Sequence, residues 1–163
     1  MTANSATKRV RAGKGREGMS ESGEIAARAE AALRDGDTGT ARALAAAALR
    51  ERPQDRRLLR VAARAAADLD PDEAARLLRA LVEADPDDAE SWRELGAAAA
   101  ETGQTDQAAQ AFQRAVVLQP ADVDSLVQLA NASFVLGHAD EAVELLNRSI
   151  GLRPDQPSLL AKW

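Results

Sequence analysis

The stretch that decides the fold runs from Pro86 to Pro120 and reads PDDAESWRELGAAAAETGQTDQAAQAFQRAVVLQP. Pro154 follows Pro120 at the same distance, 34 residues, that separates Pro120 from Pro86. Three further pairs keep this distance: Gly103 and Gly137, Leu95 and Leu129, and Ala108 and Ala142. A fixed period of this length indicates stacked copies of one small structural unit. It favours a binding scaffold over an enzyme.

Regular breaks between helix-forming segments predict a chain of helix–turn–helix pairs. Ala, Leu, Arg and Glu dominate the sequence, and all four favour helix. Each repeated glycine stands where a helix end needs a left-handed residue, and each repeated proline where the next helix must not continue. The predicted helices span residues 24–34, 40–50, 56–69, 72–84, 88–102, 105–118, 122–136 and 139–152. No segment has the alternation of a strand, so we predict an all-α fold.

Ten residues define the repeat, because small side chains let two helices approach while large ones fill the space between pairs. They are Trp92, Leu95, Gly96, Ala108, Phe112, Ala115, Pro120, Gly137, Ala142 and Pro154. This pattern resembles the tetratricopeptide repeat (TPR), a helix–turn–helix of 34 residues. It departs from that family at Ala99, where a tyrosine is usual. The resemblance implies a right-handed α-solenoid of about four TPR-like pairs.

The repeat register divides the chain into three parts. Residues 1–21 are predicted to form a disordered basic tail, and Met19 within it is a plausible start site. The TPR-like domain covers residues 22–155, with repeats at about 22–55, 56–88, 89–122 and 123–155. The second repeat is one residue short, which we place in the turn at Asp70 and Pro71. Residues 156–163 look like an incomplete capping helix.

The unfinished C-terminal end has two interpretations, because a solenoid needs a polar cap over its last apolar face. In the first, the chain is the N-terminal portion of a larger protein. In the second, copies of the chain self-associate through this edge and bury Trp163.

Composition excludes several classes of function. The 163 residues carry a net charge of −5 and include no cysteine, which argues against nucleic-acid binding and excludes thiol chemistry. The basic tail alone carries +4 and is the one segment suited to an anionic surface. No apolar run reaches the ~18 residues of a membrane span, and no secretory signal is recognisable. We therefore expect a cytoplasmic protein.

The TPR resemblance implies that the first helix of each pair lines a concave groove for peptides or partner segments. The groove residues implied here are Arg57, Arg60, Arg64, Glu90, Arg93, Val127, Asn131 and Phe134. Three of them, Arg57, Arg60 and Arg64, share one helix face and suit bidentate bonds to the carboxylates of an acidic segment. The alternative for these arginines is a solvated surface. Phe134 is either an apolar anchor in the groove or a packing residue.

No constellation of catalytic or metal-binding residues accompanies this groove. His138 is the only histidine and lies in a predicted turn. We therefore predict a non-enzymatic protein–protein interaction scaffold without a cofactor or metal. The alternative is a substrate-positioning or regulatory module of a larger enzyme, of the glycosyltransferase-like or sulfotransferase-like kind.

Overall fold

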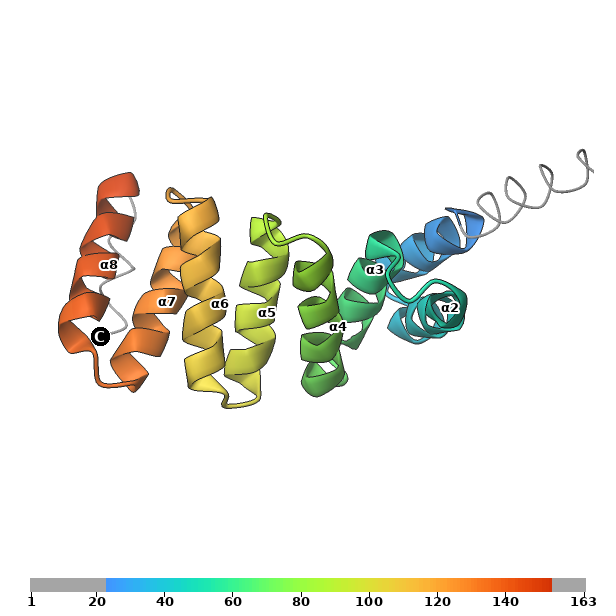
Figure 1. Cartoon of the computed structure of the whole chain (residues 1–163), viewed down its shortest axis with the longest axis horizontal. Coiled ribbons are helices and arrows are strands. Elements are labelled where there is room, and N and C mark those ends of the chain that lie inside the picture. Colours follow the sequence, from blue (N-terminus) through green and yellow to red (C-terminus); the bar gives the residue numbers. More distant parts are fainter. Residues whose placement is uncertain (1–22, 154–163) are drawn as a thin grey trace, which may run out of the picture. The chain divides into compact units, whose positions relative to one another are not determined.

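The computed structural model describes residues 23–153, and every regular element within this range is a helix. The chain divides into an N-terminal body, residues 1–65, and a C-terminal body, residues 66–163. The described N-terminal body holds a helix over residues 23–34, α2 (Thr38–Glu51) and α3 (Arg56–Ala66), which ends on the boundary. The C-terminal body holds α4 (Pro71–Ala84), α5 (Ala89–Glu101), α6 (Thr105–Leu118), α7 (Val123–Val135) and α8 (Ala139–Leu152) (Figure 1).

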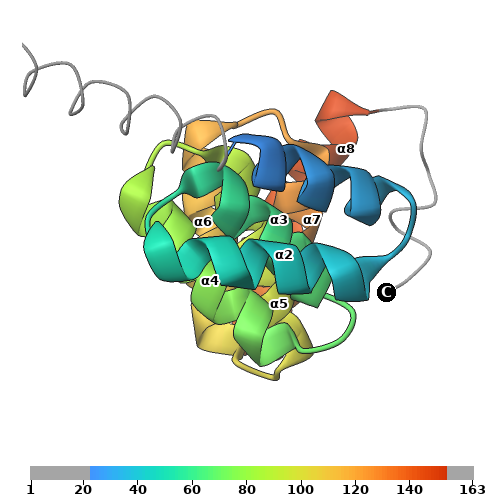
Figure 2. The ribbon, with the colours of Figure 1, turned by 90° about the vertical axis from the view of Figure 1, so that its right-hand side faces the viewer.

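The core of the N-terminal body is built from small side chains. Figure 2 shows the helix over residues 23–34 running beside α2. Ala26, Ala48 and Leu58 are buried together, one from each of the three helices, with Ile25 and Leu49 packed against them. Alanines at the contact let the helix axes approach closely. This packing fixes α3 against the two helices that precede it.

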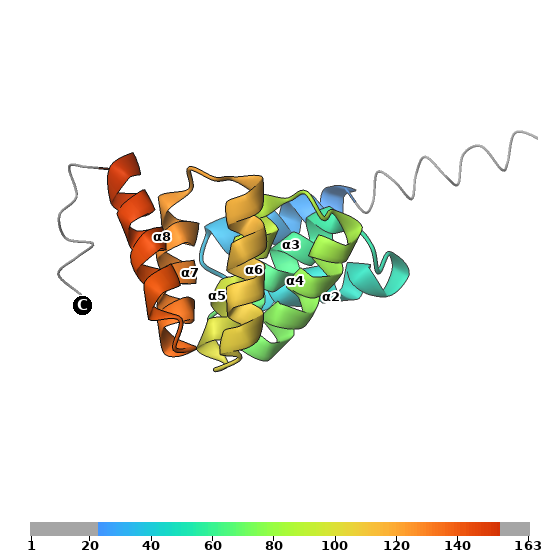
Figure 3. The ribbon, with the colours of Figure 1, turned by 60° about the vertical axis from the view of Figure 1, so that its left-hand side comes forward.

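The C-terminal body is a row of helices in chain order. In turn, α4 contacts α5, α5 contacts α6, α6 contacts α7 and α7 contacts α8 (Figures 1 and 3). The buried cluster at its centre takes residues from three consecutive helices: Ala99, Ala108, Phe112, Val116, Leu126 and Leu129. A second cluster of Ala130, Ala142 and Leu146 continues the core to α8. Each pair thus buries its apolar face on its neighbours, as stacked repeats require.

One close contact sets the distance between α5 and α6. A Cβ atom added at Gly96 would lie 2.7 Å from both Cδ1 and Cε1 of Phe112 and 2.9 Å from its Cγ. Phe112 is buried, with 2% of its surface exposed. The ring therefore fills the space that a side chain at position 96 would occupy.

Two glycines close the turns within the helix pairs of the C-terminal body. Gly103 and Gly137 have φ values of +73° and +87°, in the left-handed region that favours glycine. The next residue then bonds back across the helix end, Gln104 N to Ala99 O at 2.8 Å and His138 N to Ser133 O at 2.8 Å. This is the hydrogen bond that closes a Schellman motif.

Two glycine-to-alanine substitutions are expected to have opposite effects on stability. Gly137→Ala forces a side chain into the left-handed region, and we expect a loss of roughly 1 kcal/mol. Gly151 lies within α8 at ordinary φ with open space where a Cβ would stand. Gly151→Ala should therefore stabilise by up to about 0.5–1 kcal/mol. Thermal melts followed by circular dichroism compare the two variants, and melting shifts of the same sign would contradict this account.

Aspartates cap several helices of the C-terminal body. Asp70 precedes α4, and its Oδ1 accepts a hydrogen bond from Glu73 N at 3.0 Å. Asp122 caps α7, where its Oδ2 accepts from Ser125 N at 3.3 Å and from Ser125 Oγ at 2.5 Å. Asp88 stands in the same place before α5, and its Oδ2 accepts from Ser91 Oγ at 2.6 Å. These bonds satisfy donors that a helix start leaves without partners.

The structure corrects the prediction at the start of α4 and the end of α3. The cap of α4 is Asp70, with Pro71 as its first residue, so the helix begins one residue before the predicted start at Asp72. In α3, helix was predicted to residue 69 but ends at Ala66. The residue missing from the second repeat was placed in the following turn, and this is wrong. That turn, residues 67–70, is one residue longer than residues 102–104, while α3 is two residues shorter than α5.

Several predictions fall outside the described residues: the tail over 1–21, the capping helix over 156–163 and Pro154. Within residues 23–153, the longest helices assigned have 14 residues, and none combines the length and apolar character needed to cross a membrane. The all-α prediction is confirmed for this range.

Candidate functional site

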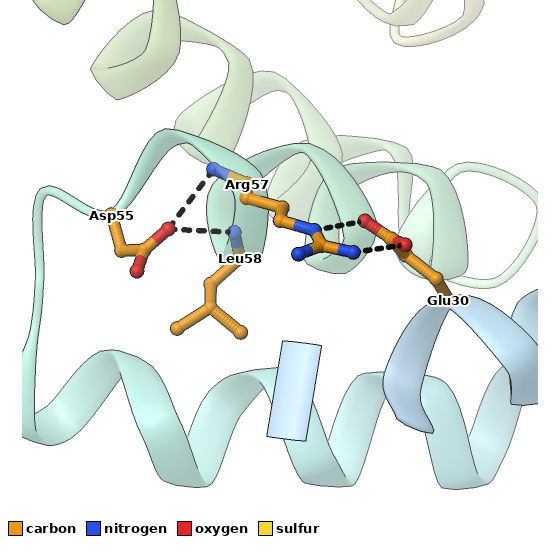
Figure 4. A network of polar contacts seen from close by, with 4 residues as sticks. All are labelled: Glu30, Asp55, Arg57 and Leu58. Atoms are coloured by element: carbon orange, nitrogen blue, oxygen red, sulfur yellow. Dashed lines mark hydrogen bonds and ion pairs between the residues drawn. The ribbon is translucent and has the colours of Figure 1, made fainter. Parts of the chain in front are cut away.

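The N-terminal end of α3 is fixed by the residue before it. Asp55 Oδ1 accepts hydrogen bonds from Arg57 N at 3.1 Å and from Leu58 N at 3.3 Å (Figure 4). The backbone carbonyl of Asp55 accepts from Leu59 N at 2.9 Å. This cap places two arginines, Arg56 and Arg57, in the first turn of the helix. Cations are disfavoured there by the helix dipole, so this part of the sequence works against helix stability.

An open cavity of about 630 Å³ lies between α3 and the helix over residues 23–34, wholly within the N-terminal body. Leu33 and Val61 form its apolar lining. Its charged lining consists of Glu30, Arg34, Arg56, Arg57, Arg60 and Arg64. Five guanidinium groups thus face one carboxylate in a chain whose net charge is −5. The local charge of the cavity is opposite in sign to that of the protein.

Glu30 and Arg57 form a two-point ion pair across the cavity (Figure 4). Arg57 Nε donates to Glu30 Oε1 at 2.5 Å, and Arg57 Nη2 donates to Glu30 Oε2 at 2.7 Å. The hydrogen bonds from Arg57 lower the pKa of Glu30, and the charges of Arg57 and Arg34 add to this effect. The same bonds raise the pKa of the Arg57 guanidinium. The side chains remain 52% and 36% exposed, so the pair is accessible to solvent.

The structure brings together three of the eight residues predicted for the groove. Arg57, Arg60 and Arg64 line this cavity, and the other five do not. Glu90 and Arg93 belong to α5, and Val127, Asn131 and Phe134 belong to α7. Phe134 is 53% exposed.

Sequence reasoning missed three charged residues of the cavity: Glu30, Arg34 and Arg56. Arg56 stands four residues before Arg60 and so continues the predicted arginine row, a signal that was present in the sequence. Glu30 and Arg34 lie on the first helix of the first repeat, whose repeat pattern is weak. Their contact with α3 depends on how the two helices pack, which spacing along the chain does not reveal.

A smaller cavity of about 240 Å³ lies in the C-terminal body. Its lining includes Trp92 and Leu95 of α5 and Arg79 of α4. Arg79 Nη2 donates to Gln107 Oε1 at 2.5 Å and to Gln104 Oε1 at 3.2 Å. Trp92 Nε1 donates to the carbonyl of Pro86 at 2.9 Å. These bonds tie the repeat together, so the cavity is a seam between packed helices.

The remaining titratable groups do not assemble a reactive site in the part of the chain that the structure describes. No three histidine, aspartate or glutamate side chains gather there as metal ligands. His138 precedes α8, and its Nδ1 lies 3.7 Å from Glu141 Oε2 on the surface.

Helix pairs of one length, closed by left-handed glycines and stacked in chain order, define an α-solenoid of the helical-repeat class. Residues 58–159 match the family described as the Cilia and flagella-associated protein 70 middle TPR-like domain. This match covers more than half of the chain, and the protein belongs to that family of TPR-like domains. The resemblance inferred from the repeated residues is confirmed.

Solved structures of TPR proteins share this fold. A crystal structure of MamA is 24% identical, covers 81% of this chain and 75% of MamA, and has a TM-score of 0.75. MamA 41-end from Desulfovibrio magneticus RS-1 is 22% identical over 83% of this chain and 77% of its own, with a TM-score of 0.76. YrrB, described as a TPR protein with an unusual peptide-binding site, is 21% identical over 82% and 70%, with a TM-score of 0.75. No curated protein matches the sequence.

Proposed function

We propose that this protein is a non-catalytic interaction scaffold that holds an acidic segment of a partner protein in the arginine-lined cavity. One observation carries the proposal: five arginines and one glutamate line a single open cavity of an otherwise acidic chain. Guanidinium groups form planar, two-point hydrogen bonds with carboxylates, and the Glu30–Arg57 pair already has this geometry. An acidic side chain from a partner would find the same kind of donor along α3.

Two further features support a binding role. Arg56 and Arg57 stand in the first turn of α3, where cations oppose the helix dipole. Residues that break a local stability rule are often retained for function. The TPR-like fold supplies a rigid support, since the cavity is formed by side chains of two helices and not by loops. The YrrB description of a peptide-binding site shows that this fold can hold peptides.

Affinity capture from a lysate of the source organism tests this role. The native chain is compared with an Arg57→Ala/Arg60→Ala/Arg64→Ala variant, and captured proteins are identified by mass spectrometry. The matched control removes three exposed arginines outside the cavity, as Arg28→Ala/Arg50→Ala/Arg76→Ala. Circular dichroism confirms that each variant remains helical.

We expect a partner that is retained by the native chain and by the control but lost with the cavity variant. The captured segment should be rich in Asp and Glu, and its retention should weaken as salt rises, because exposed charges are screened. Equal retention by the native chain and the cavity variant would move the binding site elsewhere. If no protein were retained by the native chain, the scaffold proposal would fail.

A further inference from the structure

The arginines of the cavity form a row with a regular spacing. Arg56, Arg60 and Arg64 follow one another at intervals of four residues on α3, and all three line the cavity. An α-helix rises 1.5 Å per residue, so successive members of the row are about 6 Å apart along the helix axis. Four residues also complete slightly more than one turn, which keeps the row on one face.

An extended peptide has a spacing that fits this row. Its side chains alternate between two faces, and residues two apart on one face are about 6.6 Å apart. Acidic residues at three alternating positions therefore span about 13 Å, compared with about 12 Å from the first to the last arginine. Arginine side chains are long enough to absorb a difference of this size.

The volume of the cavity favours an extended ligand over a helical one. A helix has a diameter of about 10–12 Å, so a segment long enough to face three arginines occupies about 1000 Å³ or more. The cavity holds about 630 Å³. A single extended strand is narrower, and its second face would meet the apolar surface of Leu33 and Val61.

The remaining charges set the direction of contact. Arg34 stands on the opposite wall of the cavity and adds positive charge there. Arg57 Nε and Nη2 are bonded to Glu30, which leaves Nη1 as the guanidinium nitrogen outside that pair (Figure 4). The repeating contact for a ligand is therefore the row Arg56, Arg60 and Arg64, and Glu30 repels a further carboxylate beside Arg57.

We propose that the cavity reads spacing as well as charge: it binds an extended segment of a partner protein with acidic residues at three alternating positions. This inference rests on the proposed function and specifies the ligand of the same site. The ligand chemistry is three carboxylates at every second residue, with small or apolar residues between them.

Fluorescence anisotropy with labelled synthetic peptides tests this proposal on the full chain. Three peptides have the same length and composition, with three aspartates at alternating positions, in consecutive positions, or at every fourth position. A fourth peptide carries one phosphoserine at the centre in place of the three aspartates. The alternating peptide should bind at least tenfold more tightly than each of the others.

Arg60→Ala provides the matching test on the protein side. Removal of the central arginine should weaken the alternating peptide at least tenfold and have little effect on a peptide that lacks the central aspartate. This non-additivity identifies a direct contact. The control is Arg28→Ala, an exposed arginine outside the cavity that should leave every affinity unchanged.

The other outcomes separate failure of this inference from failure of the proposed function. Equal affinity for the three aspartate peptides would overturn the spacing proposal and leave a less selective acidic site. Tightest binding of the every-fourth peptide would replace the extended ligand by a helical one, and tightest binding of the phosphoserine peptide would replace the carboxylate row by a phosphate. Absence of binding by every peptide would overturn the inference, and capture from lysate would then decide the scaffold role separately.

Discussion

Phe112→Ala is expected to lower the free energy of unfolding by about 3–5 kcal/mol, the largest effect of any substitution considered. Phe112 is buried and packs with residues of α5 and α7 as well as its own helix. Truncation removes its apolar surface and leaves a cavity that the surrounding helices fill only in part. A loss of this size is a large fraction of the 5–15 kcal/mol that stabilises an ordinary domain.

Urea unfolding followed by circular dichroism measures this loss. The control is the neighbouring exposed residue, since Gln113→Ala should change the stability by less than about 0.5 kcal/mol. If Phe112→Ala does not fold, Phe112→Leu gives a smaller loss that can still be measured. A Phe112→Ala variant as stable as the Gln113→Ala variant would show that the core is not centred on this ring.

Gly96→Ala is expected to destabilise the protein by about 1–3 kcal/mol, although alanine is the better helix former. In an open helix position the same change stabilises by about 0.5–1 kcal/mol. At Gly96 the added methyl group would stand 2.7 Å from the ring of Phe112, which is buried and has no space to withdraw. Either the ring or the α5–α6 contact must shift. Gly96→Leu should cost at least as much, for the same reason.

A double substitution tests the cause of this loss. Phe112→Leu replaces the ring with a smaller side chain, so Gly96→Ala should cost clearly less in that background than in the native chain. Thermal melts of the four proteins give the coupling, with about 2–4 °C expected per kcal/mol for a chain of this size. Equal costs in both backgrounds would mean that the methyl group and the ring do not meet.

The sequence predicts most of the fold because the repeat expresses it in local signals. The 34-residue period, the glycines at 103 and 137 and the helix-forming composition each act within a few residues of the structure they specify. Accordingly, α6 and α8 begin and end at the predicted residues. The errors lie in the second repeat, where no glycine marks the end of α3 and the chain closes the helix early at Ala66.

Less of the candidate site could be predicted, because it depends on contacts between helices. Arg57, Arg60 and Arg64 share a face of one helix, and the helical period alone reveals this. Glu30 is 27 residues before Arg57, and its bond to that arginine is created by the packing of two helices. No single-helix pattern predicts it. The cavity residues on α5 and α7 were assigned from the family resemblance, and that assignment stays a prediction.

The paired caps of α5 and α7 bear on how such a chain can change its length during evolution. Asp88 bonds Ser91, and Asp122 bonds Ser125, so each pair repeats after one full period. Loss of residues 89–122 would place Asp88 directly before Val123 and three positions ahead of Ser125, which recreates the same pair. Duplication of that segment would likewise copy it. A whole repeat is therefore a cassette that can be inserted or removed with its helix start intact, whereas a deletion of any other length would separate an aspartate from its serine.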